Sequence, residues 1–341
     1  MSADLRFAIG GRRTDVRIVT TLDPACLGTA GARVTVFDRT TGSLFGAGAE
    51  NPLVLAPGES AKQWASVESV LQRCASLGMG RDGTVIGIGG GVICDLAAFA
   101  ASLYMRGCGL ILAPTTLLSM VDACLGGKTG IDFLGYKNLV GTFYPASLIL
   151  IATASLRSLP EQELRSGIAE AIKTAIVGDR ALLDLLCDAK ADVDARDDAI
   201  LAEIVRRSLA VKGRIVEQDP TENGVRAQLN LGHTFGHALE SATGFSTWRH
   251  GEAVAWGIGR AIALGLRLGL TDRAFADRVE AVLRLYGFRV DAGARYEDLA
   301  PAMARDKKRR GGRLRLAIPR DQCDVVLREV DDEALADVLG G

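Results

Sequence analysis

The stretch Val85–Asp95 reads VIGIGGGVICD and gives the strongest indication of the fold. An apolar run typical of a buried β-strand leads into three consecutive glycines, and an apolar segment with helical spacing follows. Glycines at such a turn let the backbone approach a pyrophosphate closely, and a helix N-terminus offers free N–H groups to an anion. The stretch predicts a strand, a glycine turn and a helix that either bind a nucleotide or simply pack tightly.

Asp95 lies at the expected start of this helix. Its carboxylate could accept hydrogen bonds from a nicotinamide ribose, or it could serve only as a favourable charge near the helix N-terminus. Short apolar runs and amphipathic segments alternate on both sides of the glycine turn, which is typical of βα units around a parallel sheet. The predicted strands are Val16–Thr20, Val34–Phe37, Leu53–Ala56, Val85–Ile88 and Leu110–Leu112, and the predicted helices are Ser60–Leu77 and Cys94–Leu103.

The sequence changes character beyond about Leu156. Glycine-rich loop is predicted around residues 121–138, and loop with one buried strand over Asn138–Leu156. Long segments with a 3.6-residue apolar period then follow, at Glu161–Val177, Arg180–Asp188, Asp198–Glu217, Ala253–Leu268, Thr271–Leu285 and Asp331–Leu339. We therefore expect an α/β domain over residues 1–157 and a mostly α-helical domain over residues 158–341.

Composition excludes several classes of protein. The 341 residues include 40 basic and 41 acidic side chains, so net charge gives no support to a nucleic-acid or anionic-membrane partner. The N-terminal segment has charges where a signal peptide needs an apolar core. The seven cysteines are scattered without CxxC spacing, which suits a reducing cytoplasm.

All three histidines fall within residues 233–250. His233 and His237 are four residues apart and share a helical face, and His250 follows shortly after. The pair lacks the glutamate of an H-E-x-x-H motif, so a metalloprotease is not indicated. Two imidazoles and one carboxylate would make a catalytic zinc site with an open position. Glu170 could supply the carboxylate because it stands in an apolar helical segment, although a salt bridge with Lys173 would also explain it.

Cations and glycines between residues 121 and 138 predict anion binding. Lys128 and Lys137 lie in this segment, which does not have the spacing of a Walker A motif. Further cations stand at Arg106, Lys212 and Arg226, while the basic run over residues 305–310 is typical of a solvated loop. Together these residues indicate a substrate with more than one anionic group.

Seven segments occur in an order that resembles the 3-dehydroquinate synthase family of sugar-phosphate cyclases. They are GGGVICDLAAFAASLYMRG, PTTLLSMVDACLGGKTG, GYKNLVGTFYP, LPEQELRSGIAEAIK, LNLGHTFGHALE, HGEAVA and DKK, and the resemblance covers roughly residues 56–310. It implies a Rossmann-like NAD-binding domain, a helical metal-binding domain and a cytoplasmic homodimer.

The implied reaction converts 3-deoxy-D-arabino-heptulosonate 7-phosphate to 3-dehydroquinate and phosphate. NAD is transiently reduced, phosphate is eliminated, the hydride returns, and an intramolecular aldol reaction closes the ring. The reaction belongs to the shikimate pathway of aromatic amino acid biosynthesis.

The resemblance also assigns residues to roles. The metal, zinc or cobalt, falls to Glu170, His233 and His250. The catalytic and carboxylate-binding set is His237, Lys173, Asp122, Lys212 and Arg226. The substrate phosphate falls to Lys128, Asn138, Asn230 and Lys308, with Arg106 reaching across from the partner subunit. The cofactor contacts are Glu59, Lys62, Gly90, Gly91, Asp95, Thr115, Thr116, Lys137 and Glu163.

Other functions are compatible with parts of this pattern. An amino-dehydroquinate synthase or another specialised cyclase could use nearly the same site. Relatives that act on uncarboxylated sugars replace one or both of the cations at Lys212 and Arg226, and their presence here favours a carboxylated substrate. A metal-dependent NAD polyol dehydrogenase would need no phosphate-binding residues, and a non-catalytic binding protein would not need the complete set of metal ligands.

Overall fold

The computed structural model describes residues 4–22, 27, 31–244, 247–290, 293–304, 309–310 and 313–339. The chain divides into two compact units. The first consists of Met1–Pro160 with Lys212–Thr221, and the second of Glu161–Val211 with Glu222–Gly341.

A seven-stranded sheet forms the centre of the first unit. In spatial order its strands are β1 (Leu5–Ile9), β2 (Arg12–Val19), β9 (Leu148–Ala152), β6 (Gly109–Pro114), β5 (Thr84–Gly89), β3 (Arg33–Asp38) and β4 (Pro52–Leu55). β1 pairs antiparallel with β2, and all other neighbours run parallel. The chain passes from β3 outward to β4 and then returns to β5 on the other side of β3, so the strand order reverses between β3 and β5. In open parallel sheets such a reversal marks the usual place of a ligand site.

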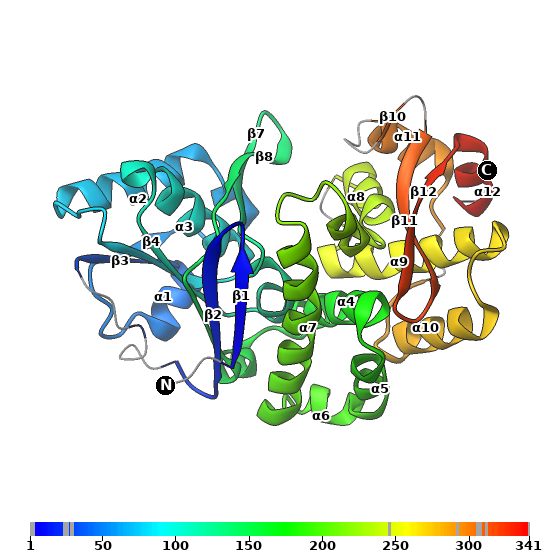
Figure 1. The fold of residues 1–341 in the computed structure, drawn as a ribbon, viewed down its shortest axis with the longest axis horizontal. Coiled ribbons are helices and arrows are strands. Elements are labelled where there is room, and N and C mark those ends of the chain that lie inside the picture. Colours follow the sequence, from blue (N-terminus) through cyan, green and yellow to red (C-terminus); the bar gives the residue numbers. More distant parts are fainter. Residues whose placement is uncertain are drawn as a thin grey trace. The chain divides into compact units, whose positions relative to one another are not determined.

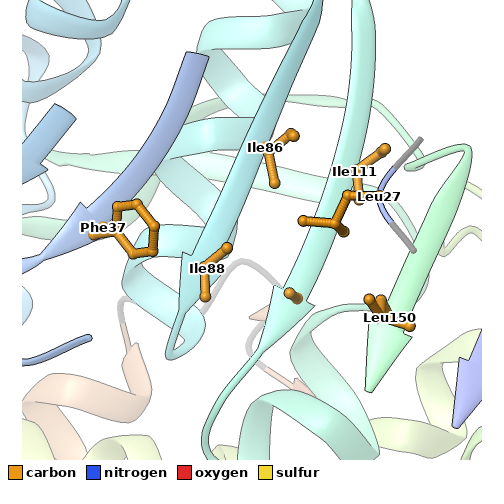
Figure 2. Packing of buried hydrophobic residues seen from close by; sticks show 7 residues of the cluster. Leu27, Phe37, Ile86, Ile88, Ile111 and Leu150 are labelled. Atoms are coloured by element: carbon orange, nitrogen blue, oxygen red, sulfur yellow. The ribbon is translucent and has the colours of Figure 1, made fainter. Parts of the chain in front are cut away.

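Helices of the first unit connect these strands. They are α1 (Arg39–Phe45), α2 (Trp64–Ser76) and α3 (Gly91–Leu103), with short helical turns at η2 (Glu59–Ala61), η3 (Tyr104–Arg106), η4 (Ser119–Ala123) and η5 (Thr153–Ser158). Figure 2 shows the apolar core on neighbouring strands, where Phe37, Ile86, Ile88, Ile111 and Leu150 gather with Leu27. Five predicted strands and both predicted helices are present with shifted ends, and the Ser60–Leu77 helix is interrupted between η2 and α2.

The glycine turn packs α3 closely against β5. A Cβ placed on Gly89 would lie 2.6 Å from Cβ of Ile93, so this position admits only glycine without a shift of the helix. α3 begins at Gly91, and its first turn holds no acidic residue. Asp95 therefore lies one turn further along than expected, too far inside the helix to act as a charge at its first turn.

Residues 128–143 form a β-hairpin where loop was predicted. β7 (Lys128–Phe133) and β8 (Tyr136–Phe143) make a separate two-stranded sheet, visible in Figure 1. Every residue of β8 is exposed, so the strand lacks the alternation of buried and exposed positions that reveals a strand in a sequence.

The second unit is mostly helical. Its helices are α4 (Glu161–Gly178), α5 (Arg180–Asp188), α6 (Lys190–Asp194), α7 (Asp198–Gln218, in the first unit from Lys212 onward), η6 (Val225–Asn230), α8 (His233–Ala242), α9 (His250–Arg267), α10 (Arg273–Leu285), α11 (Tyr296–Ala304) and α12 (Asp332–Leu339). α9 packs against α4, α8 and β11.

A three-stranded sheet of the second unit was not predicted. It consists of β10 (Arg309–Arg310), β11 (Arg313–Asp321) and β12 (Asp324–Val330), all antiparallel. The start of β11 alternates exposed arginines with buried leucines, a strand signal that the helical character of the region obscured. The predicted fold class, an α/β domain followed by a mostly helical domain, is confirmed. Among the described residues no helix is both long and apolar enough to span a membrane.

Replacing Gly89 with alanine should destabilise the chain by about 1–3 kcal/mol, because the new methyl group overpacks the contact with Ile93. Gly91→Ala is the matched control, since its Cβ would meet Ala123 only at 3.7 Å and alanine favours the helix. Urea unfolding of both variants measures the difference. Equal stabilities would show that α3 does not depend on close contact at Gly89.

Candidate metal and nucleotide sites

Three predicted metal ligands from separate helices converge in the second unit. Glu170 lies in the middle of α4 with no exposed surface, while His233 and His250 are the first residues of α8 and α9. One carboxylate oxygen, Oε1 of Glu170, lies 3.5 Å from Nε2 of His233 and 3.3 Å from Nε2 of His250. The ligand atoms of all three residues lie within 4.8 Å of one another.

The imidazole of His233 is oriented by the backbone. Its Nδ1 lies 3.3 Å from the carbonyl oxygen of Leu231, which can only accept a hydrogen bond, so Nδ1 is the donor. Burial lowers the pKa of His233 well below its usual range, and the ring is therefore neutral. Its Nε2 then carries a lone pair that faces the carboxylate of Glu170.

This donor set fits a divalent metal ion. In tetrahedral zinc sites the metal–ligand distances of about 2.0–2.2 Å place neighbouring ligand atoms about 3.3–3.6 Å apart. The two distances from Glu170 agree with that spacing. A cation between a carboxylate oxygen and an imidazole lone pair also offsets the repulsion between two acceptors. Three protein ligands leave one coordination position for a substrate.

The other oxygen of Glu170 has a different contact. Oε2 lies 2.5 Å from Nζ of Lys173, one helical turn later, and both side chains are buried. The salt bridge with Lys173 and the approach of the two histidines, which the sequence offered as alternatives, occur together. Glu170 therefore joins a buried cation to the candidate metal ligands.

His250 lies between two carboxylates. Burial alone would lower its pKa, but hydrogen bonding to Glu170 and Glu240 outweighs this effect and raises the pKa to about 10. A metal ion at Nε2 would replace the proton on that nitrogen. Glu240 is buried on α8 and was missed from the sequence, although it follows His237 by three residues and His233 by seven, on the same helical face.

His237 completes the histidine cluster on the exposed side. Its ring stacks on that of His250, with centroids 5.8 Å apart, and meets the ring of His233 edge-on at 5.3 Å. The side chain is exposed, whereas His233 and His250 are partly buried. An exposed imidazole beside the candidate metal ligands is placed to exchange protons with a bound molecule.

In the first unit, the backbone at the glycine turn is open to a ligand at Gly91. Gly90 is the N-cap of α3 and Gly91 its first residue. A Cβ on Gly91 would touch only Ala123, at 3.7 Å, so packing does not require glycine there. The free N–H groups of this helix start, at the carboxyl end of β5, fit an approaching pyrophosphate.

Lys62 connects three elements beside this turn. Its buried ammonium donates to Oδ2 of Asp95 on α3 at 2.6 Å and to the side-chain oxygen of Asn138 on β8. Burial alone would lower the pKa of Lys62, but Asp95 outweighs it and raises the pKa. Asp95 therefore pairs with a lysine. Asn138, which was predicted to bind phosphate, contacts Lys62, a predicted cofactor residue that also binds Asp95.

Asp122 and Lys212 also meet within the first unit. The buried Lys212 ammonium forms an ion pair with the Asp122 carboxylate and donates to its backbone carbonyl at 2.5 Å. Thr116 shares a hydrogen bond of 2.8 Å with Ser119, and Thr115 is buried nearby in the chain. Exposed positions are occupied by Glu59, Arg106, Lys128 and Lys137.

The remaining predicted residues lie in the second unit. Arg226 is buried on η6, and the amide of Asn230 on the same turn donates to Glu222, a second acidic residue that the sequence analysis missed. Glu163, a predicted cofactor contact on α4, forms an exposed ion pair with Arg249. Lys308 lies outside the described residues.

Lys173→Met should destabilise the metal-free chain by about 3–5 kcal/mol, because it leaves the buried charge of Glu170 with less compensation. Lys190→Met is the matched control, since its i,i+4 pair with Asp194 is exposed and should contribute less than about 1 kcal/mol. Urea unfolding in the presence of a chelator gives both values. A loss for Lys173→Met no larger than the control would contradict the importance of the buried pair.

Comparison with known proteins extends over both units. The family model described as 3-dehydroquinate synthase N-terminal matches residues 52–166, and that described as 3-dehydroquinate synthase C-terminal matches residues 167–309. A 3-dehydroquinate synthase of Pseudomonas aeruginosa is 42% identical over 304 residues, covering 85% of this chain and 82% of the relative.

Solved structures share the fold. A 2-epi-5-epi-valiolone synthase of Streptomyces hygroscopicus subsp. jinggangensis, solved with NAD+ and Zn2+ bound, matches with a TM-score of 0.87 at 31% identity and covers 96% of this chain and 95% of that one. A 2-deoxy-scyllo-inosose synthase complexed with carbaglucose-6-phosphate, NAD+ and Co2+ has the same TM-score at 21% identity, with 98% of each chain covered. Both halves of the family model match in order, and with the close relative they show that this chain belongs to the 3-dehydroquinate synthase family.

Proposed function

We propose that this chain is a 3-dehydroquinate synthase that converts 3-deoxy-D-arabino-heptulosonate 7-phosphate to 3-dehydroquinate and phosphate. The observation that most directly supports it, beside family membership, is the convergence of Glu170, His233 and His250 on one point. A polyol dehydrogenase also needs a metal, but it needs no phosphate-binding residues, so the family match and the proposed phosphate contacts Lys128, Asn138 and Asn230 favour the cyclase. The cations at Lys212 and Arg226 favour a carboxylated substrate.

The proposed reaction requires two bound groups. When bound, NAD would accept and return a hydride, and a divalent metal such as zinc or cobalt would stabilise a developing alkoxide as a Lewis acid. The α3 start at Gly90 and Gly91 would hold the pyrophosphate, with Glu59, Lys62, Asp95, Thr115, Thr116, Lys137 and Glu163 as the further proposed cofactor contacts. Glu170, His233 and His250 would hold the metal.

The chain's own side chains would then bind and protonate the substrate. His237 is exposed beside the metal ligands and would hold or pass the proton of a substrate hydroxyl. Lys173 would keep Glu170 charged and, with Asp122, orient hydroxyl groups. Elimination of phosphate would break a C–H bond and the C–O bond to phosphate on adjacent carbons and form a C=C bond, with the phosphate leaving together with its ester oxygen and taking up the proton.

Separate sets of cationic and amide side chains would recognise the two anionic ends of the substrate. Lys128, Asn138, Asn230 and Lys308 are proposed for the phosphate, with Arg106 supplied by the partner subunit of a homodimer. Lys212 and Arg226 are proposed for the carboxylate. Both of these cations are buried, where pairing with an anion is more favourable than at the surface. A cytoplasmic location accords with cysteines that are free among the described residues.

Incubation of the zinc-loaded chain and NAD with the heptulosonate phosphate should release one phosphate per product, without net accumulation of NADH. Phosphate assay, absorbance at the NADH band and product mass measure the three quantities together. Accumulating NADH without phosphate would indicate a dehydrogenase instead. Turnover restricted to an aminated or uncarboxylated sugar phosphate would indicate a specialised cyclase.

Arg226→Leu should lower kcat/KM for the heptulosonate phosphate roughly 10- to 100-fold, mainly through KM, because the carboxylate loses a charged hydrogen-bond partner. Arg328→Leu removes an exposed arginine of the same unit and is the control, with unchanged kinetics expected. Steady-state kinetics with folding checked by circular dichroism makes the comparison. Unaltered KM in Arg226→Leu would exclude this residue from carboxylate recognition.

A further inference from the structure

The imidazole of His250 has an acidic neighbour on each side. Nε2 faces Oε1 of Glu170 at 3.3 Å, and Nδ1 lies 3.4 Å from Oε2 of Glu240. The corresponding nitrogen of His233 faces the carbonyl oxygen of Leu231 at 3.3 Å. Both candidate ligands therefore direct Nε2 inward to Glu170 and Nδ1 outward to an acceptor, but only His250 uses a side chain for that purpose.

We propose that Glu240 is a positioning residue, which fixes the tautomer and ring orientation of His250 so that Nε2 is available to a metal ion. Nδ1–H of His250 donates a hydrogen bond to Oε2 of Glu240, since an ionised carboxylate can only accept. With that proton held on Nδ1, the neutral ring presents its lone pair at Nε2. The inference rests on the metal site of the proposed function and adds a residue that contacts neither the metal nor the substrate.

The location of Glu240 suits this task. Glu240 is only 4% exposed and lies on α8, the helix that begins with His233. One helix thus provides a candidate ligand and the carboxylate that orients the other, while α9 packs directly against it. A buried carboxylate beside an imidazole also increases the basicity of the ring as a metal ligand.

A competing arrangement places the metal elsewhere. His237, Glu240 and His250 also offer three ligand atoms within 4.8 Å of one another. A neutral imidazole has a lone pair on one nitrogen only, so a metal at Nδ1 of His250 would leave a proton on Nε2 facing Glu170. The buried group of Glu170, His233 and His250 would then lose a ligand, whereas Nδ1 protonation keeps all three.

The test compares metal binding by Glu240→Ala and Glu240→Gln with wild type. Chelator competition measures the zinc dissociation constant, and the visible absorption of the cobalt-loaded protein reports ligand geometry. Glu240→Ala should weaken zinc binding 10- to 100-fold with one metal per chain retained. The zinc affinity of Glu240→Gln should lie between those of Glu240→Ala and wild type, because the amide oxygen can still accept a hydrogen bond from Nδ1–H.

Glu252→Gln is the matched control. Glu252 stands two residues after His250 in the first turn of α9, and its carboxylate accepts from the backbone N–H of Arg249 rather than from His250. This variant should leave zinc affinity and the cobalt spectrum unchanged. Circular dichroism and the melting temperature identify any variant that fails to fold, and Glu240→Gln provides the isosteric alternative if Glu240→Ala does.

Two results would overturn the inference. Folded Glu240 variants with wild-type zinc affinity and cobalt spectra would show that His250 needs no such partner. If Glu240→Ala lost all bound metal, as His250→Ala is expected to do, Glu240 would itself be a metal ligand. Turnover by wild type is measured separately. If the Glu240 variants bind zinc more weakly than wild type, but wild type itself does not turn over the heptulosonate phosphate, the proposed function is refuted and this inference stands.

Discussion

The second unit depends on one constraint, which is that the fully buried carboxylate of Glu170 must be compensated. A buried charge is expensive unless it is compensated, and here Lys173 lies against one oxygen while His233 and His250 approach the other. Each partner must come from a fixed place on α4, α8 or α9. The same packing that keeps water from Glu170 therefore brings two imidazoles to the distance that a metal ion requires.

The first unit meets a different requirement, which is to bring backbone close to a ligand without losing the packing of helix on sheet. Gly89 satisfies the packing, because a side chain there would collide with Ile93, while Gly91 leaves space above the helix start. A single run of glycines thus contains two kinds of position. They look alike in the sequence, and only the neighbouring atoms distinguish them.

The sequence was sufficient for the fold class and for the three converging metal candidates, because buried strands, amphipathic helices and clustered histidines all leave local patterns. It was insufficient where the partner is distant or the pattern weak. The exposed hairpin β7–β8 has no alternation, and β11 lies among helical segments. Lys62 was expected beside a cofactor. Its hydrogen bond to Asn138, 76 residues away, depends on the β7–β8 hairpin, which was not predicted from the sequence. Glu240 could have been found from its helical spacing to His233 and His237.

The histidine cluster has a consequence for spectroscopy. Because the chain has only three histidines and all belong to one cluster, no imidazole elsewhere contributes a background signal. Every histidine ring resonance in a nuclear magnetic resonance spectrum of the untagged chain is a reporter of this cluster. Isotope labelling of histidine alone would therefore give a complete view of how the cluster responds to an added ligand, without the need to assign the rest of the molecule.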